Sequence, residues 1–207
     1  MAHTESTKRI LYYVHDPMCS WCYGFRRLWQ QLQTQLPDDI EVRYVVGGLA
    51  PDSSEPMPEG MQSMLISTWE RITQAIPGTQ FNFDFWKNNQ PRRSTYPSCR
   101  ATLAARQLDA SKETAMVEAI QNAYYQQALN PSDDETLINV AESIGLDGTL
   151  FAEALNSPAT QQALQQELQF ARSIGGDSFP SLILQQDGKH RTLMLSYTDA
   201  DKLLAQL

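Results

Sequence analysis

Hydrophobic positions recur along the chain with two different periods, and these periods predict where strands and helices lie. The run of β-branched and aromatic residues at 10–14 is typical of a buried strand. Residues 40–46 alternate apolar and polar side chains before becoming apolar throughout, which predicts a second strand. Between the two, large apolar side chains are spaced as on one face of a helix, at Phe25, Leu28, Trp29, Leu32 and Leu36. We therefore expect a βαβ unit with parallel strands and a right-handed crossover.

Helical periodicity dominates the central stretch, residues 61–171. Within it, Ser132 and Glu135 have the spacing of a capping box and predict a helix that stops at Gly145. Residues 81–86 interrupt the pattern, because they alternate as a strand does and yet are rich in aromatic side chains. We interpret them as an extended loop that closes one side of the core or of a cleft, although such residues more often belong to the core.

Strand periodicity returns only near the C-terminus. Residues 179–184 and 191–195 flank an Asp-Gly turn, which predicts a β-hairpin, and residues 199–207 have the spacing of an amphipathic helix. Strands from both ends of the chain would then share one α/β fold. The chain is accordingly divided into an N-terminal part, a helical insert and a C-terminal part, at residues 8–56, 57–173 and 174–207.

The composition is that of a globular chain with an acidic surface. Its 207 residues are 42% hydrophobic, which is enough for a sizeable core, and 24 acidic against 16 basic residues give a net charge of −8. Because this balance offers no basic patch, we expect neither a nucleic-acid partner nor an anionic membrane surface. The apolar runs are far shorter than the roughly 20 residues that cross a bilayer, and the first residues lack the apolar segment of a secretory signal. We therefore expect a cytoplasmic protein.

Two cysteines stand where the first predicted strand gives way to the first helix. Cys19 and Cys22 are spaced i, i+3, so their side chains share one helix face and are close enough to form a disulfide. Cys19 should lie at or just before the first helical turn, where unpaired N–H groups and the positive end of the helix dipole favour a thiolate. A thiolate is the form that attacks disulfides, so this stretch is our candidate for a redox-active centre.

Zinc binding is the competing interpretation of a Cys-x-x-Cys pair. A structural zinc site needs four ligands, and the rest of the chain offers only a few, none in paired spacing: Cys99, His3, His15 and His190. Three cysteines are also too few for the disulfide framework of a small secreted domain. We therefore favour redox chemistry and expect no metal.

The chain carries a family resemblance in three landmarks, at residues 16–24, 47–49 and 176–182. In this order, with a helical insertion between the last two, they resemble the DsbA-like branch of the thioredoxin-fold superfamily, and most of all its FrnE-like cytosolic thiol-disulfide oxidoreductases. The resemblance implies an α/β, thioredoxin-like fold with a large all-helical insertion. It also implies a protein-disulfide oxidoreductase or isomerase that needs no cofactor beyond its redox-active Cys19–Cys22 disulfide.

The same resemblance implies a cis peptide bond before Pro180, facing the cysteine pair, with Phe179 offering backbone groups to an extended peptide or a thiol ligand. The position agrees, because Pro180 opens an apolar strand where a missing N–H is tolerated. We expect Cys19 to attack and form the mixed disulfide, and the less exposed Cys22 to resolve it. The expected substrate-binding residues are Pro180, Phe179, Trp21, Ser20 and Pro17.

Other residues near the pair have two interpretations each. Trp21 either shields the cysteines or packs in the ordinary way, and Asp16 is expected to shape the loop that leads into the helix. His15 could support the Cys19 thiolate if it is protonated, but a histidine at a strand end is more often a satisfied polar group. Cys99 is more often a buried small hydrophobe than a third redox cysteine or a site of glutathionylation.

Related families of this fold leave a second function open. Kappa-class glutathione transferases and hydroxychromene-carboxylate isomerases resemble the architecture but have a serine at the position of Cys19 and bind glutathione. Since this chain keeps both cysteines, dithiol exchange is favoured, with glutathione still open as a reductant or a ligand. The central Ser20-Trp21 pair also differs from the histidine-containing pair of the periplasmic enzyme that names the branch, so its strongly oxidising potential is not carried over.

Three classes of function therefore remain: a dithiol oxidoreductase, a glutathione-dependent transferase or isomerase, and a non-catalytic peptide-binding module. For the first, the expected partners are a thiol or disulfide substrate, protein or small molecule, and a recycling reductant or oxidant. Residue identities do not determine whether electrons flow toward the substrate or away from it.

Overall fold

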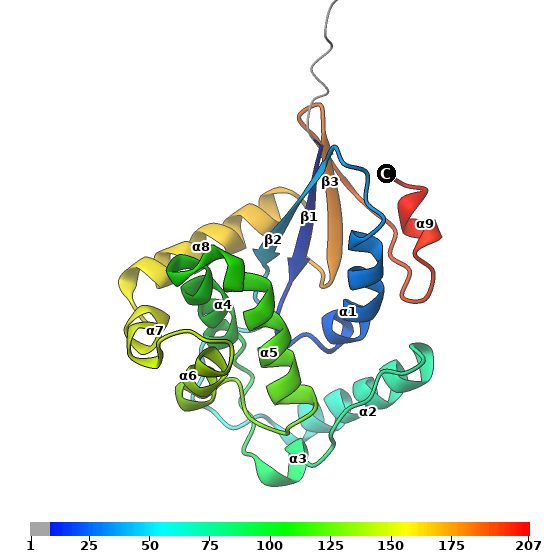
Figure 1. The fold of residues 1–207 in the computed structure, drawn as a ribbon. Helices are drawn as coiled ribbons and strands as arrows, with labels where there is room; N and C mark the ends of the chain where they lie inside the picture. The colour runs from blue at the N-terminus through cyan, green and yellow to red at the C-terminus, as the bar shows by residue number, and fades with distance from the viewer. Residues whose placement is uncertain (1–8) are drawn as a thin grey trace, which may run out of the picture.

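One mixed sheet of four strands lies at the centre of the computed structural model, which describes residues 9–207 (Figure 1). In the order β2-β1-β3-β4, the sheet is built from β1 (Arg9–His15), β2 (Ile40–Val46), β3 (Ser181–Gln186) and β4 (Lys189–Thr192). β1 runs parallel to β2 and antiparallel to β3, and β3 runs antiparallel to β4. The predicted α/β class, the parallel pair and the C-terminal hairpin are confirmed. Residue 8, where the predicted first part begins, and His3 lie outside the described residues.

Helices cover both faces of the sheet and build a further layer beside it (Figure 1). In chain order they are α1 (Ser20–Gln33), α2 (Glu59–Ala75), α3 (Phe85–Asn88), α4 (Tyr96–Leu108), the 3₁₀ turn η1 (Ala110–Lys112), α5 (Glu113–Tyr125), α6 (Asp134–Ser143), α7 (Gly148–Leu155), α8 (Pro158–Ser173) and α9 (Asp201–Leu204). α1 and α9 lie on one face of the sheet and α8 on the other, while α4 to α7 pack around an apolar cluster of their own. Within residues 9–207, no helix has the length and apolar character needed to span a membrane.

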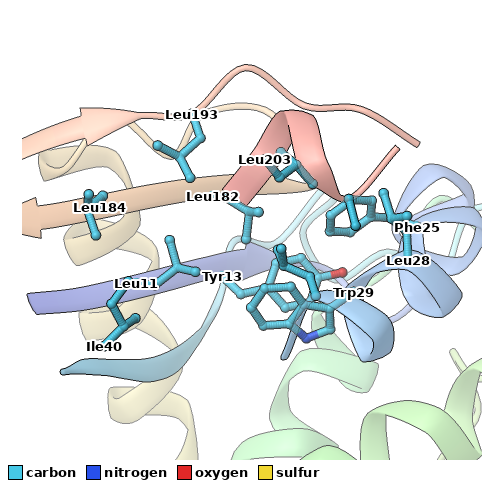
Figure 2. Packing of buried hydrophobic residues seen from close by; sticks show 12 residues of the cluster. Leu11, Tyr13, Phe25, Leu28, Trp29, Ile40, Leu182, Leu184, Leu193 and Leu203 are labelled. Atoms are coloured by element: carbon cyan, nitrogen blue, oxygen red, sulfur yellow. The ribbon is translucent and has the colours of Figure 1, made fainter. Parts of the chain in front are cut away.

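Residues 11–14 of β1 are buried on both faces of the sheet, which explains why the run at residues 10–14 contains no charged side chain. Leu11 and Tyr13 point into the cluster beneath α1 and α9, whereas Tyr12 and Val14 point into the cluster beneath α8. Figure 2 shows the first cluster, in which β1 meets side chains from α1, β3 and α9, among them Phe25, Leu28, Trp29, Leu182 and Leu203. Packing on both faces of the sheet therefore fixes the orientation of β1, and with it the position of the cysteine pair that follows this strand.

Several element boundaries differ from the predicted ones. α1 ends before Leu36, which nevertheless packs against the same cluster. Residues 81–84 form no strand and Phe85 begins α3, because the aromatic rings of this run pack around the buried Trp69 in the core. β4 is exposed throughout and ends at Thr192, because the segment that follows it turns back toward α1. α9 is shorter than the predicted helix at residues 199–207.

The prediction of a capping box at Ser132 and Glu135 is also wrong, although the predicted end of that helix is confirmed. α6 uses Asp133 as its N-cap residue, because the hydroxyl of Ser132 donates to the backbone oxygen of Ser94 instead, at 2.7 Å. The helix stops as predicted, since Gly145 has a φ of +86°, which favours glycine. The Asp187–Gly188 turn is confirmed too, because both residues have a positive φ, as a two-residue hairpin turn requires.

Candidate active site

Cys19 is the N-cap residue of α1. Its backbone is extended, with φ −77° and ψ 115°, and its Sγ accepts a hydrogen bond from the backbone N–H of Cys22 at 3.2 Å. The unpaired N–H groups of the first turn and the helix dipole stabilise negative charge on a side chain at this position. The predicted placement of Cys19, just before the first helical turn, is confirmed.

Cys22 lies in the first turn of α1 and is fully buried, while Cys19 is 5% exposed. Both are thiols rather than a disulfide in this structure. Burial raises the pKa of Cys22 well above its ordinary value, and the hydrogen bond and charge of Cys19 raise it further. Of the two sulfurs, Cys19 is therefore the one that an incoming molecule reaches first, and Cys22 stays protonated beneath it.

The third landmark, residues 176–182, lies beside the cysteine pair although it is far from it in the sequence. The Sγ of Cys19 donates to the carbonyl oxygen of Phe179 at 3.5 Å, and the Phe179–Pro180 peptide bond is cis, the isomer that the resemblance implies. The Phe179 ring packs on Gly47, where a Cβ atom would fall only 1.8 Å from the ring. A glycine is therefore needed at this position for the ring to approach. The landmarks that meet around Cys19 are residues 16–24, 47–49 and 176–182.

Asp16 joins the cysteine loop to two other segments. Its buried carboxyl accepts hydrogen bonds from the N–H of Met18 (2.8 Å), the N–H of Leu49 (2.7 Å) and the hydroxyl of Thr95 (2.6 Å). Burial raises the pKa of Asp16, and these hydrogen bonds act against that shift. Sequence reasoning missed this wider role because Leu49 and Thr95 are 33 and 79 residues away.

Cys99 lies beside the same carboxyl. It is fully buried, which confirms one of its two interpretations, and its thiol donates to Asp16 Oδ2 at 3.6 Å. Burial raises the pKa of Cys99 well above its ordinary value, so this thiol is a poor nucleophile. Among residues 9–207, no group of three or more His, Cys, Asp or Glu side chains is arranged to hold a metal ion.

His15 differs from both of its interpretations. It is fully buried, and burial lowers its pKa to about 3, so it is neutral at pH 7 and supplies no positive charge to Cys19. It is not a satisfied polar group either, because neither ring nitrogen has a hydrogen-bond partner in the described part of the chain. The ring instead stacks on Tyr13, with centroids 5.1 Å apart, and lies edge-on to Tyr44.

The expected substrate-binding residues divide into accessible and buried ones. Trp21 is half-buried against Tyr197, with ring centroids 5.0 Å apart, so part of its ring remains accessible at the surface. Ser20 and Pro17 are buried, and the Ser20 hydroxyl accepts a hydrogen bond from Trp69 Nε1 at 2.9 Å. The contact with substrate expected of Ser20 and Pro17 stays a prediction.

Tyrosines surround the two thiols, and sequence reasoning did not single them out. Tyr125 of α5 donates its hydroxyl to the backbone oxygen of Met18 at 2.6 Å. The pKa values of Tyr13 and Tyr197 are raised first by burial and then by the charges of the two cysteines, which lie near both phenols. The cysteine pair thus sits in an aromatic environment that helps to keep Cys22 dry.

Comparisons with known proteins identify a family and a fold for the chain. A family model described as thioredoxin matches residues 12–202. A structure from Nitrosomonas europaea, provisionally described as a protein disulfide isomerase, has a TM-score of 0.83 at 22% identity and covers 96% of this chain and 95% of that one. The cytosolic disulfide reductase DsbM from Pseudomonas aeruginosa has a TM-score of 0.74 at 26% identity, over 89% of each chain. A second structure of DsbM, with GSH, has a TM-score of 0.71 at 25% identity.

Among curated proteins, the ClpXP adapter protein SpxH of Halalkalibacterium halodurans is 24% identical over 181 residues. The match covers 86% of this chain and 58% of SpxH, so the chain spans little more than half the length of this relative. Together with the structural matches, the match over residues 12–202 confirms the predicted thioredoxin-like fold.

Proposed function

This chain belongs to the thioredoxin family and has a DsbA-like fold, and on that premise we propose that it is a thiol-disulfide oxidoreductase working through Cys19 and Cys22. One observation carries the proposal: the Sγ of Cys19 lies between the N–H of Cys22 and the carbonyl oxygen of Phe179. The first contact stabilises a thiolate. The second sets the backbone of the Pro180 loop beside the sulfur that reacts.

In the reductive direction, the Cys19 thiolate attacks one sulfur of a substrate disulfide. A bond forms between Cys19 and that sulfur, and the other substrate sulfur leaves as a thiolate and takes up a proton. Cys22 then loses its proton and attacks the Sγ of Cys19, which releases the second substrate sulfur and leaves a Cys19–Cys22 disulfide. Two electrons pass to the substrate, and two molecules of a small thiol restore the dithiol as they become a disulfide.

We infer that the chain acts as a reductase in the cytoplasm, with glutathione as the recycling thiol. A relative 26% identical to it is named a cytosolic disulfide reductase, and one structure of that relative contains GSH.

Turnover of a disulfide substrate tests the proposal. The purified protein should reduce insulin disulfides with dithiothreitol as the electron source, and Cys19→Ser should abolish this activity. Cys22→Ser should stop after the first step and accumulate a mixed disulfide on Cys19, which mass spectrometry detects. Cys99→Ala is the matched control for the loss of a thiol and should retain turnover, because Cys99 is fully buried.

Two outcomes would contradict the proposal. A wild-type protein that is folded and does not turn over any disulfide substrate would exclude it. Saturable glutathione binding with turnover that survives Cys22→Ser would instead indicate the glutathione-dependent transferase or isomerase, because that chemistry needs no resolving cysteine.

A non-catalytic peptide-binding module is the second candidate, because the curated relative is named as an adapter protein for ClpXP. The half-buried Trp21 and Phe179 would then hold an extended segment of a partner protein. Affinity for a partner peptide that is unchanged by Cys19→Ser, without any thiol turnover, would favour this candidate over the first.

A further inference from the structure

A polar crevice lies farther along α1, where this helix faces α5 and the loop that follows α2. Its volume is about 450 Å³, within the range of pockets that hold small molecules. Nearly every lining side chain carries a hydrogen-bonding group, and neither cysteine belongs to the lining, which includes Tyr23, Arg26, Arg27, Glu118, Asn122 and Gln126. A cavity of this composition suits a small charged ligand rather than an apolar one.

Arg26 is held in place from two sides. Its guanidinium lies over the Tyr23 ring, with Cζ 4.3 Å from the ring centroid, and its Nη1 donates to Asn122 Oδ1 at 2.8 Å. A guanidinium has five N–H donors, and the contact with Asn122 uses one of them. Within residues 9–207 no carboxylate lies within ion-pair distance of Arg26. Its charge is therefore positioned without an anionic partner.

Arg27 brings a second guanidinium to the crevice. Gly78 has a φ of +81°, and a Cβ atom there would fall 2.5 Å from Arg27 Nη1. The glycine therefore lets the loop after α2 turn and lets Arg27 lie against its backbone. Arg27 also has no ion pair in the described part of the chain, although acidic residues outnumber basic ones by 24 to 16. Arg27 is exposed, and like Arg26 it lines the crevice, so the two guanidiniums leave donors that can bind an external carboxylate there.

The other walls of the crevice are already joined by hydrogen bonds. On the α5 side, Glu118 accepts from the side-chain amide of Gln30 at 2.8 Å. At the floor, the Tyr23 hydroxyl and Gln126 Nε2 both donate to the backbone oxygen of Gln80, at 3.0 and 2.7 Å. These contacts connect α1, α5 and the loop after α2, so the crevice is formed before any ligand enters.

We propose that this crevice binds a short acidic peptide-like molecule of about dipeptide size, with its carboxylates on Arg26 and Arg27 and its ammonium group toward Glu118. The side-chain amides of Asn122 and Gln126 match the hydrogen-bonding groups of a peptide bond. The proposal does not rest on disulfide exchange, because the cysteines lie outside the crevice. A ligand that binds here binds the folded chain and not the unfolded one, so it raises the melting temperature, and the rise continues with the logarithm of the ligand concentration above Kd.

Isothermal titration calorimetry with L-glutamyl-L-glutamate and the full chain tests this site. We expect saturable binding that is about tenfold weaker in Arg26→Gln and in Arg27→Gln, since each variant loses a charge-assisted contact. Arg172→Gln is the matched control: Arg172 is exposed on α8, on the opposite face of the sheet, and its loss should leave the affinity unchanged. L-glutaminyl-L-glutamine, which has the same size but uncharged side chains, should bind about tenfold more weakly than the acidic peptide.

The double variant Cys19→Ser/Cys22→Ser separates this site from the proposed redox centre. Unchanged binding of L-glutamyl-L-glutamate by this variant supports the crevice, and loss of binding would place the peptide at the cysteines and overturn the proposal. Equal affinity of the wild type and both arginine variants would overturn it as well, as would a wild type that shows no saturable binding. Circular dichroism establishes that each variant is folded, and Glu118→Gln gives an independent reduction in affinity from the opposite wall.

Discussion

The sheet and the helical layer meet at two junctions of opposite character. At the buried junction, Asp16 accepts a hydrogen bond from Thr95 before α4, and Tyr125 of α5 donates to the backbone of the cysteine loop. At the open junction, α1 and α5 are connected by the exposed pair of Gln30 and Glu118, beside a crevice of about 450 Å³. The buried junction positions the reacting sulfur, whereas the open junction leaves polar groups in water and accessible to a ligand.

The difference in burial between the two junctions should change how much a substitution lowers the free energy of unfolding. A buried donor that loses its acceptor stays unpaired, so the free energy of unfolding falls by the full cost of desolvating that donor. An exposed donor that loses its acceptor bonds to water instead, so the loss is small. Equivalent substitutions at the two junctions should therefore differ several-fold in their effect on the free energy of unfolding.

The largest effect is expected from Asp16→Ala, which breaks the buried junction. The N–H groups of Met18 and Leu49 and the hydroxyl of Thr95 lose their acceptor at once, so we expect the free energy of unfolding to fall by about 3 to 5 kcal/mol. Disulfide turnover should fall with it, because the loop that holds Cys19 loses its anchor. Urea denaturation measures the first effect, and Asp16→Asn, which keeps one acceptor, should lose less. A loss below about 1 kcal/mol for Asp16→Ala would contradict the importance of this junction.

How far the sequence predicts the site depends on whether the interacting residues are local. The position of the cysteine pair follows from periodicity on either side of it, so both the strand at residues 10–14 and the N-cap of α1 could be predicted. The network of Asp16 could not, because its partners come from distant segments. His15 was assigned a role that its burial excludes, and the capping residue of α6 was misplaced because Ser132 bonds to Ser94, across the fold, instead of to its own helix.

The buried His15 makes the free energy of unfolding depend on pH. Its pKa is about 3 in the folded chain against 6.5 when unperturbed, so between these values the unfolded chain binds more protons. Stability therefore rises with pH across this window and is lost as pH falls through it. Glu113 acts in the opposite sense, since burial raises its pKa from 4.5 to about 7 and stability falls as pH rises between those values.

His15→Phe isolates the contribution of the histidine from that of Glu113. Between pH 6.5 and pH 4.5, the wild type should lose about 2 to 3 kcal/mol more of its free energy of unfolding than the variant does, at about 1.4 kcal/mol per pH unit. Phenylalanine keeps an aromatic ring against Tyr13, so the stacking is preserved. Urea denaturation over a pH series measures the difference. Parallel pH profiles of the two proteins would show that His15 is not held neutral in the folded chain.

A smaller effect is expected from Tyr125→Phe, which removes one hydrogen bond from the buried junction. The phenol donates to the backbone oxygen of Met18 at 2.6 Å, so its loss should cost about 1 kcal/mol in the free energy of unfolding. Tyr124→Phe is the matched control, because this neighbouring buried phenol makes no hydrogen bond to residues 9–207. Equal losses in the two variants would assign the effect to packing and not to the hydrogen bond.

The smallest effect is expected at the open junction, from Gln30→Ala. Its exposed hydrogen bond to Glu118 is replaced by water, so the free energy of unfolding should change by less than about 0.5 kcal/mol. A double-mutant cycle makes the comparison strict: Gln30→Ala with Glu118→Ala should show a coupling energy near zero, and Asp16→Ala with Thr95→Val a coupling above about 1 kcal/mol. Equal coupling energies would mean that the hydrogen bonds of the two junctions contribute equally to stability. The crevice would then be part of the structural framework, and a ligand entering it would have to break contacts that the fold requires.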